Sequence, residues 1–164
     1  MRRDPAHWIA FGLGSGLARW APGTVGTLWA WVAFLVLERW LGATGFGVLI
    51  GTGTLLAVWA CTRTAQHLGT ADPGAIVCDE VLAFWTVLWV LAPASWWTQA
   101  AAFVLFRFFD TAKPGPVGWA DRYFKQHAGQ PGIGWRQGLG ILVDDFVAAL
   151  CTLLVMAVVV RLWD

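Results

Sequence analysis

The feature that most limits the fold of this chain is a series of apolar runs that end at charged residues. The runs cover about Val25–Leu37, Phe46–Ala60, Val81–Ala92, Trp97–Phe109 and Phe146–Val160. Only 13% of the residues are charged, whereas an ordinary soluble domain carries about 25%. Several runs are shorter than the roughly 20 residues that a membrane crossing usually needs, so some helices depend on their polar ends or span the bilayer partially. We therefore predict one domain, residues 1–164, that is an all-α polytopic membrane bundle of four to five apolar helices.

The positions of the basic residues predict the orientation of this bundle. One side can take nearly all of them, namely Arg2, Arg3, Arg19, Arg63, Arg107, Lys113, Arg122, Lys125 and Arg136. Only Arg39 and Arg161 then lie opposite, which gives five crossings and satisfies the positive-inside rule. The Gly-rich segment 12–27 and the main charged segments thereby come to the cytoplasmic face. A net charge of +1 with dispersed basic residues gives no reason to expect a nucleic-acid partner.

The segment from Phe106 to Arg122 concentrates charge in a chain that otherwise avoids it. Arg107 and Asp110 are three residues apart, so they share one face of a helix. Pro114 and Pro116 then predict the end of helical structure, with Lys113 in a rigid polar turn. Ionisable groups at the end of an apolar helix indicate either a functional site or an exit to water.

Carboxylates at other helix ends can join this segment on the same face. Asp79-Glu80 and Asp144-Asp145 each precede an apolar run. Carboxylate oxygens are the ligands that Mg²⁺ prefers, and basic side chains beside them can neutralise phosphate oxygens. The predicted catalytic residues are Asp79, Glu80, Asp110, Asp144 and Asp145; the predicted Mg²⁺ ligands are Asp79, Glu80, Asp144 and Asp145; Arg107 and Lys113 are expected to bind phosphate. Which carboxylate acts as nucleophile or general base stays open.

Simpler interpretations stand beside this one. Acidic residues at a helix N-terminus are favoured by the helix dipole without any ligand. Asp121-Arg122 can be a solvated local pair, and the glycines of segment 12–26 can serve only as turns, because they match no phosphate-binding motif. The three histidines, His7, His67 and His127, are expected at the surface. Three cysteines without CxxC spacing indicate neither a disulfide framework nor a zinc site.

The ordered set of motifs resembles the bacterial phosphatidylglycerophosphatase A family. The matching residues are Gly14-Ser15-Gly16, Ala21-Pro22-Gly23-Thr24-Val25-Gly26-Thr27-Leu28, Asp79-Glu80, Phe106-Arg107, Asp110, Lys113-Pro114, Pro116, Asp121-Arg122, Gly138, Gly140-Ile141 and Asp144-Asp145. The resemblance covers nearly the whole chain. It implies a Mg²⁺-dependent, multi-pass phosphatase of the bacterial inner membrane that converts phosphatidylglycerophosphate to phosphatidylglycerol, with its site facing the cytoplasm. It also implies that Ser15, Thr24 and Thr27 contact the substrate.

One departure concerns the segment 123–137, YFKQHAGQPGIGWRQ, which is longer than the link expected in this family. It leaves open how the region of Asp121 is placed relative to Asp144-Asp145. The other phosphatase classes fit less well, because Asp110 lacks the second Asp of DxDx[TV] and Cys78 lacks the Arg of CxxxxxR.

Two competing classes remain. A transport or cation-binding membrane protein would use the same acids along an ion path, and it should carry ionisable groups near the bilayer midplane. A structural interaction protein would explain the GxxxG pair Gly47 and Gly51 and the high Trp content. It would give no role to Arg107, Asp110 and Lys113 together.

Overall fold

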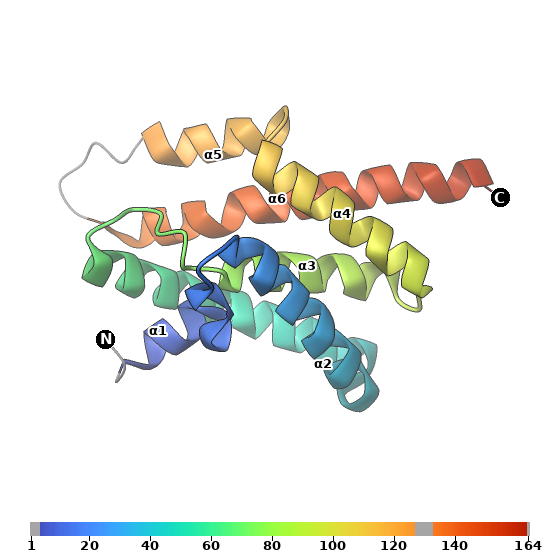
Figure 1. Cartoon of the computed structure of the whole chain (residues 1–164), viewed down its shortest axis with the longest axis horizontal. Helices are drawn as coiled ribbons and strands as arrows, with labels where there is room; N and C mark the ends of the chain where they lie inside the picture. Colours follow the sequence, from blue (N-terminus) through green and yellow to red (C-terminus); the bar gives the residue numbers. More distant parts are fainter. Residues whose placement is uncertain (1–3, 127–132, 164) are drawn as a thin grey trace.

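The structure, a computed structural model, describes residues 4–126 and 133–163, and every regular element in these ranges is helical (Figure 1). The elements are α1 (Pro5–Ala10), the 3-10 helix η1 (Gly12–Leu17), α2 (Pro22–Leu68), α3 (Cys78–Leu91), α4 (Trp96–Ala112), α5 (Pro116–Gln126) and α6 (Trp135–Trp163). The prediction of an all-α fold is confirmed for these residues.

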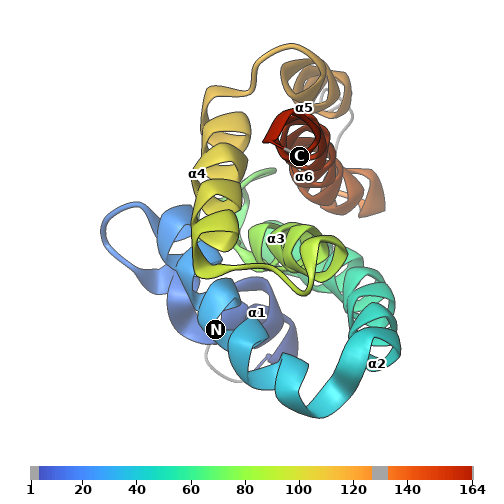
Figure 2. The ribbon, with the colours of Figure 1, turned by 90° about the vertical axis from the view of Figure 1, so that its right-hand side faces the viewer.

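Helix α2 is broken at Gly42 into two arms, which correspond to the first two predicted apolar runs. Gly42 has φ +59° and ψ 178°, a conformation that side-chain-bearing residues rarely adopt. The chain bends sharply at this glycine, and the second arm of α2 runs back along the bundle (Figures 1 and 2). The helix passes through Glu38 and Arg39, where the first run was expected to end.

Helix α3 forms the centre of the bundle, packed against α2, α4 and α6 (Figure 2). Its side chains Phe84, Val87 and Leu88 are almost fully buried. A largely apolar helix is stabilised when neighbours cover most of its circumference, and here only its C-terminal end leaves large side chains exposed, at Trp89 and Val90. The ring of Phe84 also packs against Phe106 of α4 with centroids 5.5 Å apart. This contact packs the middle of α3 against α4.

A short turn joins the third and fourth apolar runs. Helix α3 ends at Leu91 and α4 begins at Trp96. The Oγ of Ser95 accepts a hydrogen bond of 3.2 Å from the backbone N–H of Thr98, which caps α4. Trp97 is 86% exposed beside this cap, as expected for a Trp that meets a membrane interface.

The region from 110 to 143 contains more helix than predicted. Pro116 begins α5 instead of forbidding helix, because a proline is accepted in the first turn, where its missing N–H has no helical partner. Helix α6 begins at Trp135, so Asp144 and Asp145 lie inside a helix and not at its N-terminus. The helix dipole therefore does not explain this second acidic pair. Residues 127–132 of the expected insertion lie outside the described residues.

The GxxxG pair in α2 does not act as one shared contact surface. A Cβ on Gly47 would lie 3.0 Å from the ring of Trp89, so this glycine allows α2 to approach α3 closely. Gly51 faces open space.

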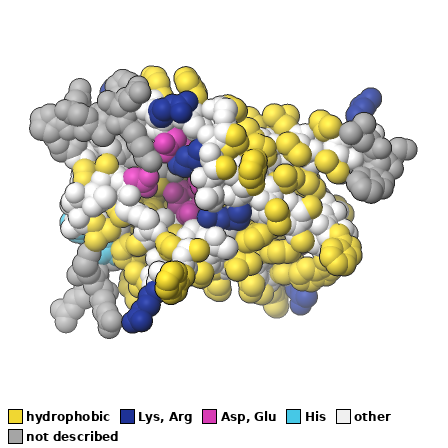
Figure 3. Space-filling model, turned by 45° about the horizontal axis from the view of Figure 1, so that its top comes forward, with side chains coloured by type: hydrophobic (Ala, Val, Ile, Leu, Met, Phe, Trp, Pro, Cys, Tyr) yellow, Lys and Arg dark blue, Asp and Glu magenta, His cyan; other side chains and the backbone are white. Residues whose placement is uncertain are grey.

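Helices α2 and α6 are each long and apolar enough to cross a membrane, by length and composition. Their outer faces carry large exposed apolar side chains such as Leu55, Leu154 and Val158, and hydrophobic side chains cover much of the surface (Figure 3). Of the four to five membrane crossings predicted, the described residues provide two candidate spans, and the crossing of further helices stays a prediction.

Candidate functional site

Three carboxylates from two helices meet beside the centre of the bundle. Asp79 and Glu80 lie in the first turn of α3, and Asp145 projects from the interior of α6. One oxygen from each of the three lies within 4.8 Å of the others. Asp79 and Asp145 are buried, and Glu80 is nearly so. The packing of α3 against α6 therefore gathers three carboxyl groups at a place shielded from water.

Several oxygens of this acidic cluster, defined as Asp79, Glu80 and Asp145, have no hydrogen-bond partner in the described part of the chain. They are Oδ1 of Asp79, Oε2 of Glu80 and Oδ2 of Asp145. Oδ1 of the neighbouring Asp144 is also buried without a hydrogen-bond partner. A buried polar atom without a partner is costly. A hard divalent cation would satisfy such oxygens, because Mg²⁺ and Ca²⁺ bind carboxylate oxygens. The residues thus fit a bound cation.

Arg107 links the cluster to α2 and to Asp110 of its own helix, α4. Its Nη1 donates to Oδ2 of Asp110, as their spacing predicted, and lies 3.7 Å from Oε1 of Glu80. The same nitrogen lies 3.4 Å from the hydroxyl oxygen of Thr27 in α2. The guanidinium is mostly buried, and its Nε has no partner among the described residues. Arg107 can therefore hold Asp110 and Glu80 in place and still offer a donor to an anion.

Gly23 lets the N-terminal turn of α2 approach this arginine. A Cβ at this position would collide with Oε1 of Glu80 and would lie 3.1 Å from both terminal nitrogens of Arg107. Real Cβ atoms are almost never found so close to side-chain atoms. The glycine is therefore required by a close approach at the site, and the interpretation of it as only a turn residue is incomplete.

Lys113 connects three helices at the open side of the site. It ends α4 in the left-handed conformation, with φ +45° and ψ 49°. Its ammonium donates to Oδ1 of Asp121 in α5 at 2.6 Å and to Oδ2 of Asp144 in α6. Burial opposes the charge of the ammonium, but the hydrogen bonds to Asp121 and Asp144 outweigh this effect and raise the pKa of Lys113. The side chain therefore stays cationic at physiological pH.

Asp121 is the functional candidate that sequence reasoning left undecided. It pairs with Lys113 across two helices, so it is more than a solvated neighbour of Arg122. The spacing of eight residues from Lys113 carries no signal by itself, because the contact depends on the turn before α5. Recognition of Pro116 as a helix start would have placed Asp121 one and a half turns into a helix.

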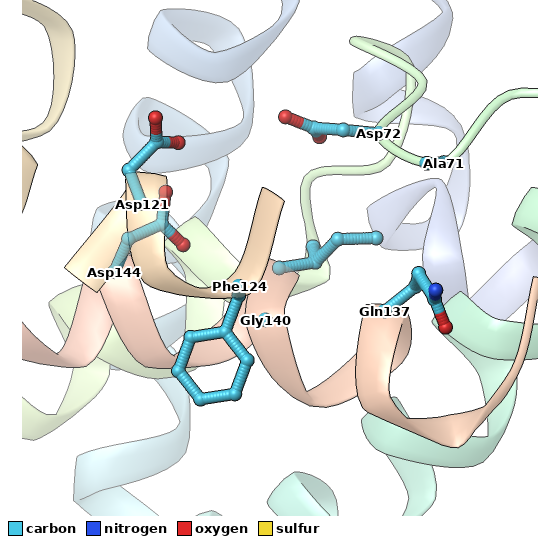
Figure 4. A pocket seen from close by; sticks show the side chains of 8 residues that line it. Ala71, Asp72, Asp121, Phe124, Gln137, Gly140 and Asp144 are labelled. Atoms are coloured by element: carbon cyan, nitrogen blue, oxygen red, sulfur yellow. The ribbon is translucent and has the colours of Figure 1, made fainter. Parts of the chain in front are cut away.

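A small cavity of about 40 Å³ lies beside Lys113's two partners (Figure 4). Figure 4 shows the carboxylates of Asp121 and Asp144 next to each other, with Asp72 across the opening on the loop that follows α2. In the space-filling view, acidic side chains gather in one recess with basic side chains around it (Figure 3). Hydrophobic surface adjoins the recess on one side (Figure 3), so an ionic headgroup and an apolar tail could contact adjacent regions.

The three hydroxyl residues predicted to bind substrate lie in different surroundings. Thr27 approaches Arg107 and donates to the carbonyl oxygen of Gly23 at 2.8 Å. Ser15 donates to the carbonyl oxygen of Gly12 within η1, and Thr24 is half-buried in the first turn of α2. The structure therefore joins Thr27 to the charged site, and the substrate role of all three residues stays a prediction.

A comparison with protein-family models matches residues 8–160 to phosphatidylglycerophosphatase A. The chain belongs to the phosphatidylglycerophosphatase A family. A phosphatidylglycerophosphatase A of Escherichia coli (strain K12) is 36% identical over 147 residues, which are 90% of this chain and 78% of the relative. One of Haemophilus influenzae is 37% identical over 153 residues, which are 93% of this chain and 87% of the relative. No solved structure matches the chain significantly.

Membership of the phosphatidylglycerophosphatase A family identifies the chain as a phosphatase and confirms the resemblance read from its motifs. One connected group contains four motif residues, Asp79, Glu80, Arg107 and Asp110. A carboxylate oxygen of Asp145 lies within 4.8 Å of those of Asp79 and Glu80. Lys113, Asp121 and Asp144 form a second group, which joins the first through the neighbouring positions 144 and 145 of α6. In this phosphatidylglycerophosphatase A family member, Asp144 therefore pairs with a lysine, and the group that can hold a metal ion contains Asp145 instead.

Proposed function

We propose that this phosphatase hydrolyses phosphatidylglycerophosphate to phosphatidylglycerol and inorganic phosphate, with Mg²⁺ as cofactor. The observation that carries the proposal is the set of unpartnered, buried carboxylate oxygens beside a cationic arginine. Such an arrangement suits a phosphate monoester, since anions need both a counter-cation and hydrogen-bond donors. The names of the relatives from Escherichia coli and Haemophilus influenzae support the choice of substrate.

In this mechanism Asp79, Glu80 and Asp145 hold the cation. When bound, Mg²⁺ neutralises phosphate oxygens and lowers the pKa of bound water. Arg107 and Lys113 bind the remaining phosphate oxygens, with Arg107 oriented by Asp110 and Lys113 oriented by Asp121 and Asp144. Water forms a new bond to phosphorus while the ester oxygen departs and takes up a proton. A carboxylate accepts the proton of the attacking water, and the same proton can then pass to the departing ester oxygen. The candidates for this role are Asp79, Glu80, Asp110, Asp144 and Asp145.

The proposed location is the bacterial inner membrane, with several crossings and the site at the cytoplasmic face. The distribution of basic residues supports this orientation. The apolar lengths of α2 and α6 support membrane residence. In this arrangement the headgroup reaches the charged recess from the water interface, while the acyl chains of the lipid stay in the bilayer.

A cation-binding or transport function is the second candidate, and one observation favours it. Asp144 and Asp145 lie inside α6, which is a candidate membrane span, and not at its end. Ionisable groups inside a span are typical of ion pathways as well as of enzymes. The two proposals differ in outcome, because only the enzyme releases phosphate from the lipid.

The deciding experiment measures inorganic phosphate released from phosphatidylglycerophosphate by detergent-purified protein, with Mg²⁺ or with EDTA. Asp79→Asn is compared with Glu38→Gln, which neutralises an exposed carboxylate on α2. We expect release that needs Mg²⁺, is lost in Asp79→Asn and is kept in Glu38→Gln. No release from folded wild-type protein supplied with Mg²⁺ would contradict the proposal and favour cation transport.

A further inference from the structure

A second group of metal-ligating side chains lies outside the phosphatase site. It consists of Asp4, which precedes α1, His7 of α1 and His67 in the last turn of α2, and their ligand atoms lie within 4.8 Å of one another. The expectation that both histidines are at the surface is correct for His67 and wrong for His7, which is only 3% exposed. A buried imidazole at the meeting point of two chain segments requires polar partners.

The distances between the ligand atoms suit a shared metal ion. Nε2 of His7 and Nδ1 of His67 are 3.1 Å apart, and Oδ2 of Asp4 is 3.9 Å from the same nitrogen of His67. Two ligands bound to one Zn²⁺ at about 2.0–2.1 Å are separated by roughly 3–3.5 Å in tetrahedral geometry. The two histidine nitrogens lie within this range, and the carboxylate oxygen of Asp4 lies slightly beyond it and would move toward the ion. The imidazole rings meet at 63°, so both ring nitrogens approach one point without stacking.

Thr64 supplies the outer contact that metal-binding histidines usually have. Its buried hydroxyl lies 2.9 Å from Nδ1 of His7. When this hydroxyl accepts from the Nδ1–H, the lone pair of Nε2 points toward His67, which is the tautomer that a metal ion needs.

Arg63 would compete with a metal ion for the carboxylate of Asp4. Its Nε donates to Oδ2 of Asp4 at 2.7 Å, while Oδ1 of Asp4 accepts from the backbone N–H of Ala6 and caps α1. The arginine side chain is 49% exposed, so it can move into solvent at little cost. A cation that replaced Arg63 at Oδ2 would find one carboxylate oxygen and two imidazole nitrogens.

We propose that Asp4, His7 and His67 form a binding site for one transition-metal ion of the Zn²⁺ type, which ties α1 to the end of α2. Nitrogen ligands favour Zn²⁺ and its neighbours over Mg²⁺, which prefers oxygen. The site is therefore distinct in chemistry from the acidic cluster. It stabilises the N-terminal segment, and the inference does not depend on the proposed phosphatase mechanism.

The test is titration of EDTA-treated, purified protein with Co²⁺ and with Zn²⁺ in a large excess of Mg²⁺, which occupies oxygen-only sites. Visible absorption of Co²⁺ reports nitrogen and oxygen ligands, and a thiolate charge-transfer band would reveal binding to cysteine instead. We expect one ion per chain in the wild type, at least tenfold weaker binding in His67→Ala, and about tenfold weaker binding in Thr64→Val. Because His67 is exposed, its substitution leaves the core intact even if a His7 variant fails to fold.

Arg63→Gln separates a metal site from a purely structural ion pair. We expect this variant to bind Zn²⁺ more tightly than the wild type, because the competing cation is gone, and Zn²⁺ to raise its thermal midpoint. Equal binding by wild type and His67→Ala, a thiolate spectrum, or no Co²⁺ bound in excess Mg²⁺ would each overturn the proposal. Phosphate release is not a readout here, so failure of this site and failure of the phosphatase proposal are distinguishable.

Discussion

Lys113 and Asp144 lie 31 residues apart in the chain, and the ammonium of the lysine donates directly to the carboxylate of the aspartate. The same ammonium also holds Asp121. One side chain therefore joins the end of α4 to both α5 and α6. Asp145 follows Asp144 in α6 and belongs to the acidic cluster, so this contact ties Lys113 to the helix that carries part of the cluster.

Lys113→Met should impair both stability and turnover. It removes a cation from two carboxylates that are largely shielded from water, and unpaired buried charge is strongly unfavourable. We expect a loss on the order of 2 kcal/mol in unfolding free energy and a fall in kcat/KM of about 100-fold, or about 2.7 kcal/mol. Lys113→Arg, which keeps the charge, should retain more of both. Thermal unfolding and phosphate release measure the two effects, and wild-type values in Lys113→Met would contradict this role.

The raised pKa of Lys113 gives a prediction for alkaline pH. For a group whose pKa is raised by folding, the stabilising contribution is complete below the unfolded pKa of about 10.4 and is lost as pH rises through the folded pKa. The Lys113 pairs should therefore persist across neutral and moderately alkaline pH. We expect the activity of Lys113→Arg to follow the same pH profile as the wild type from about pH 7 to pH 10. An alkaline decline that this substitution shifts would show that Lys113 titrates in that range.

Asp144→Asn and Asp145→Asn should both abolish turnover but differ in metal dependence. Asp145 lies among the ligand atoms that can hold a cation, whereas Asp144 pairs with Lys113. We therefore expect Asp145→Asn to weaken binding of Mg²⁺ at least tenfold, and Asp144→Asn to weaken it less. Mn²⁺ binding followed by electron paramagnetic resonance gives a readout that is independent of activity. Equal effects on binding would place both aspartates among the metal ligands, as the sequence predicted.

Gly23→Ala should reduce activity while leaving the helical fold in place. The added methyl group would collide with Glu80 and crowd Arg107, so one of these side chains must leave its position. Gly51→Ala is the matched control, because the same change on α2 meets open space. We expect at least a tenfold loss of kcat/KM for Gly23→Ala, about 1.4 kcal/mol, and no loss for Gly51→Ala. Circular dichroism checks that both variants stay helical.

Arg107→Lys should behave as a severe substitution despite the conserved charge. The guanidinium approaches Asp110, Glu80 and Thr27 at the same time, and an ammonium cannot reproduce this planar set of donors. We expect about a 100-fold fall in kcat/KM, with KM raised if the arginine binds phosphate in the ground state. Arg39→Lys, on the exposed part of α2, should leave both constants unchanged. Unaltered kinetics in Arg107→Lys would show that charge alone suffices at this position.

Local patterns predicted the features that depend on neighbouring residues. Apolar runs predicted helices, and the spacing of Arg107 and Asp110 predicted that they share one helix face, on which they form an ion pair. The motifs also predicted the family, which the comparisons confirm. The sequence around Pro116 and Asp144 was wrongly interpreted as non-helical. A proline in the first turn and carboxylates within a helix both resemble the end of a helix in sequence, although α5 begins at Pro116 and α6 includes Asp144.

By itself the sequence determined the helical class, the apolar surface and the set of charged residues that could act together. Only the tertiary structure decided which of them meet: Asp145 with Asp79 and Glu80, Lys113 with Asp121 and Asp144, and His7 with His67. The physical reason is that helix formation follows from residues three or four apart, whereas these contacts join residues tens of positions apart. Such contacts depend on how whole helices pack, and a change of register or rotation in α6 would exchange Asp144 for Asp145 at the cluster.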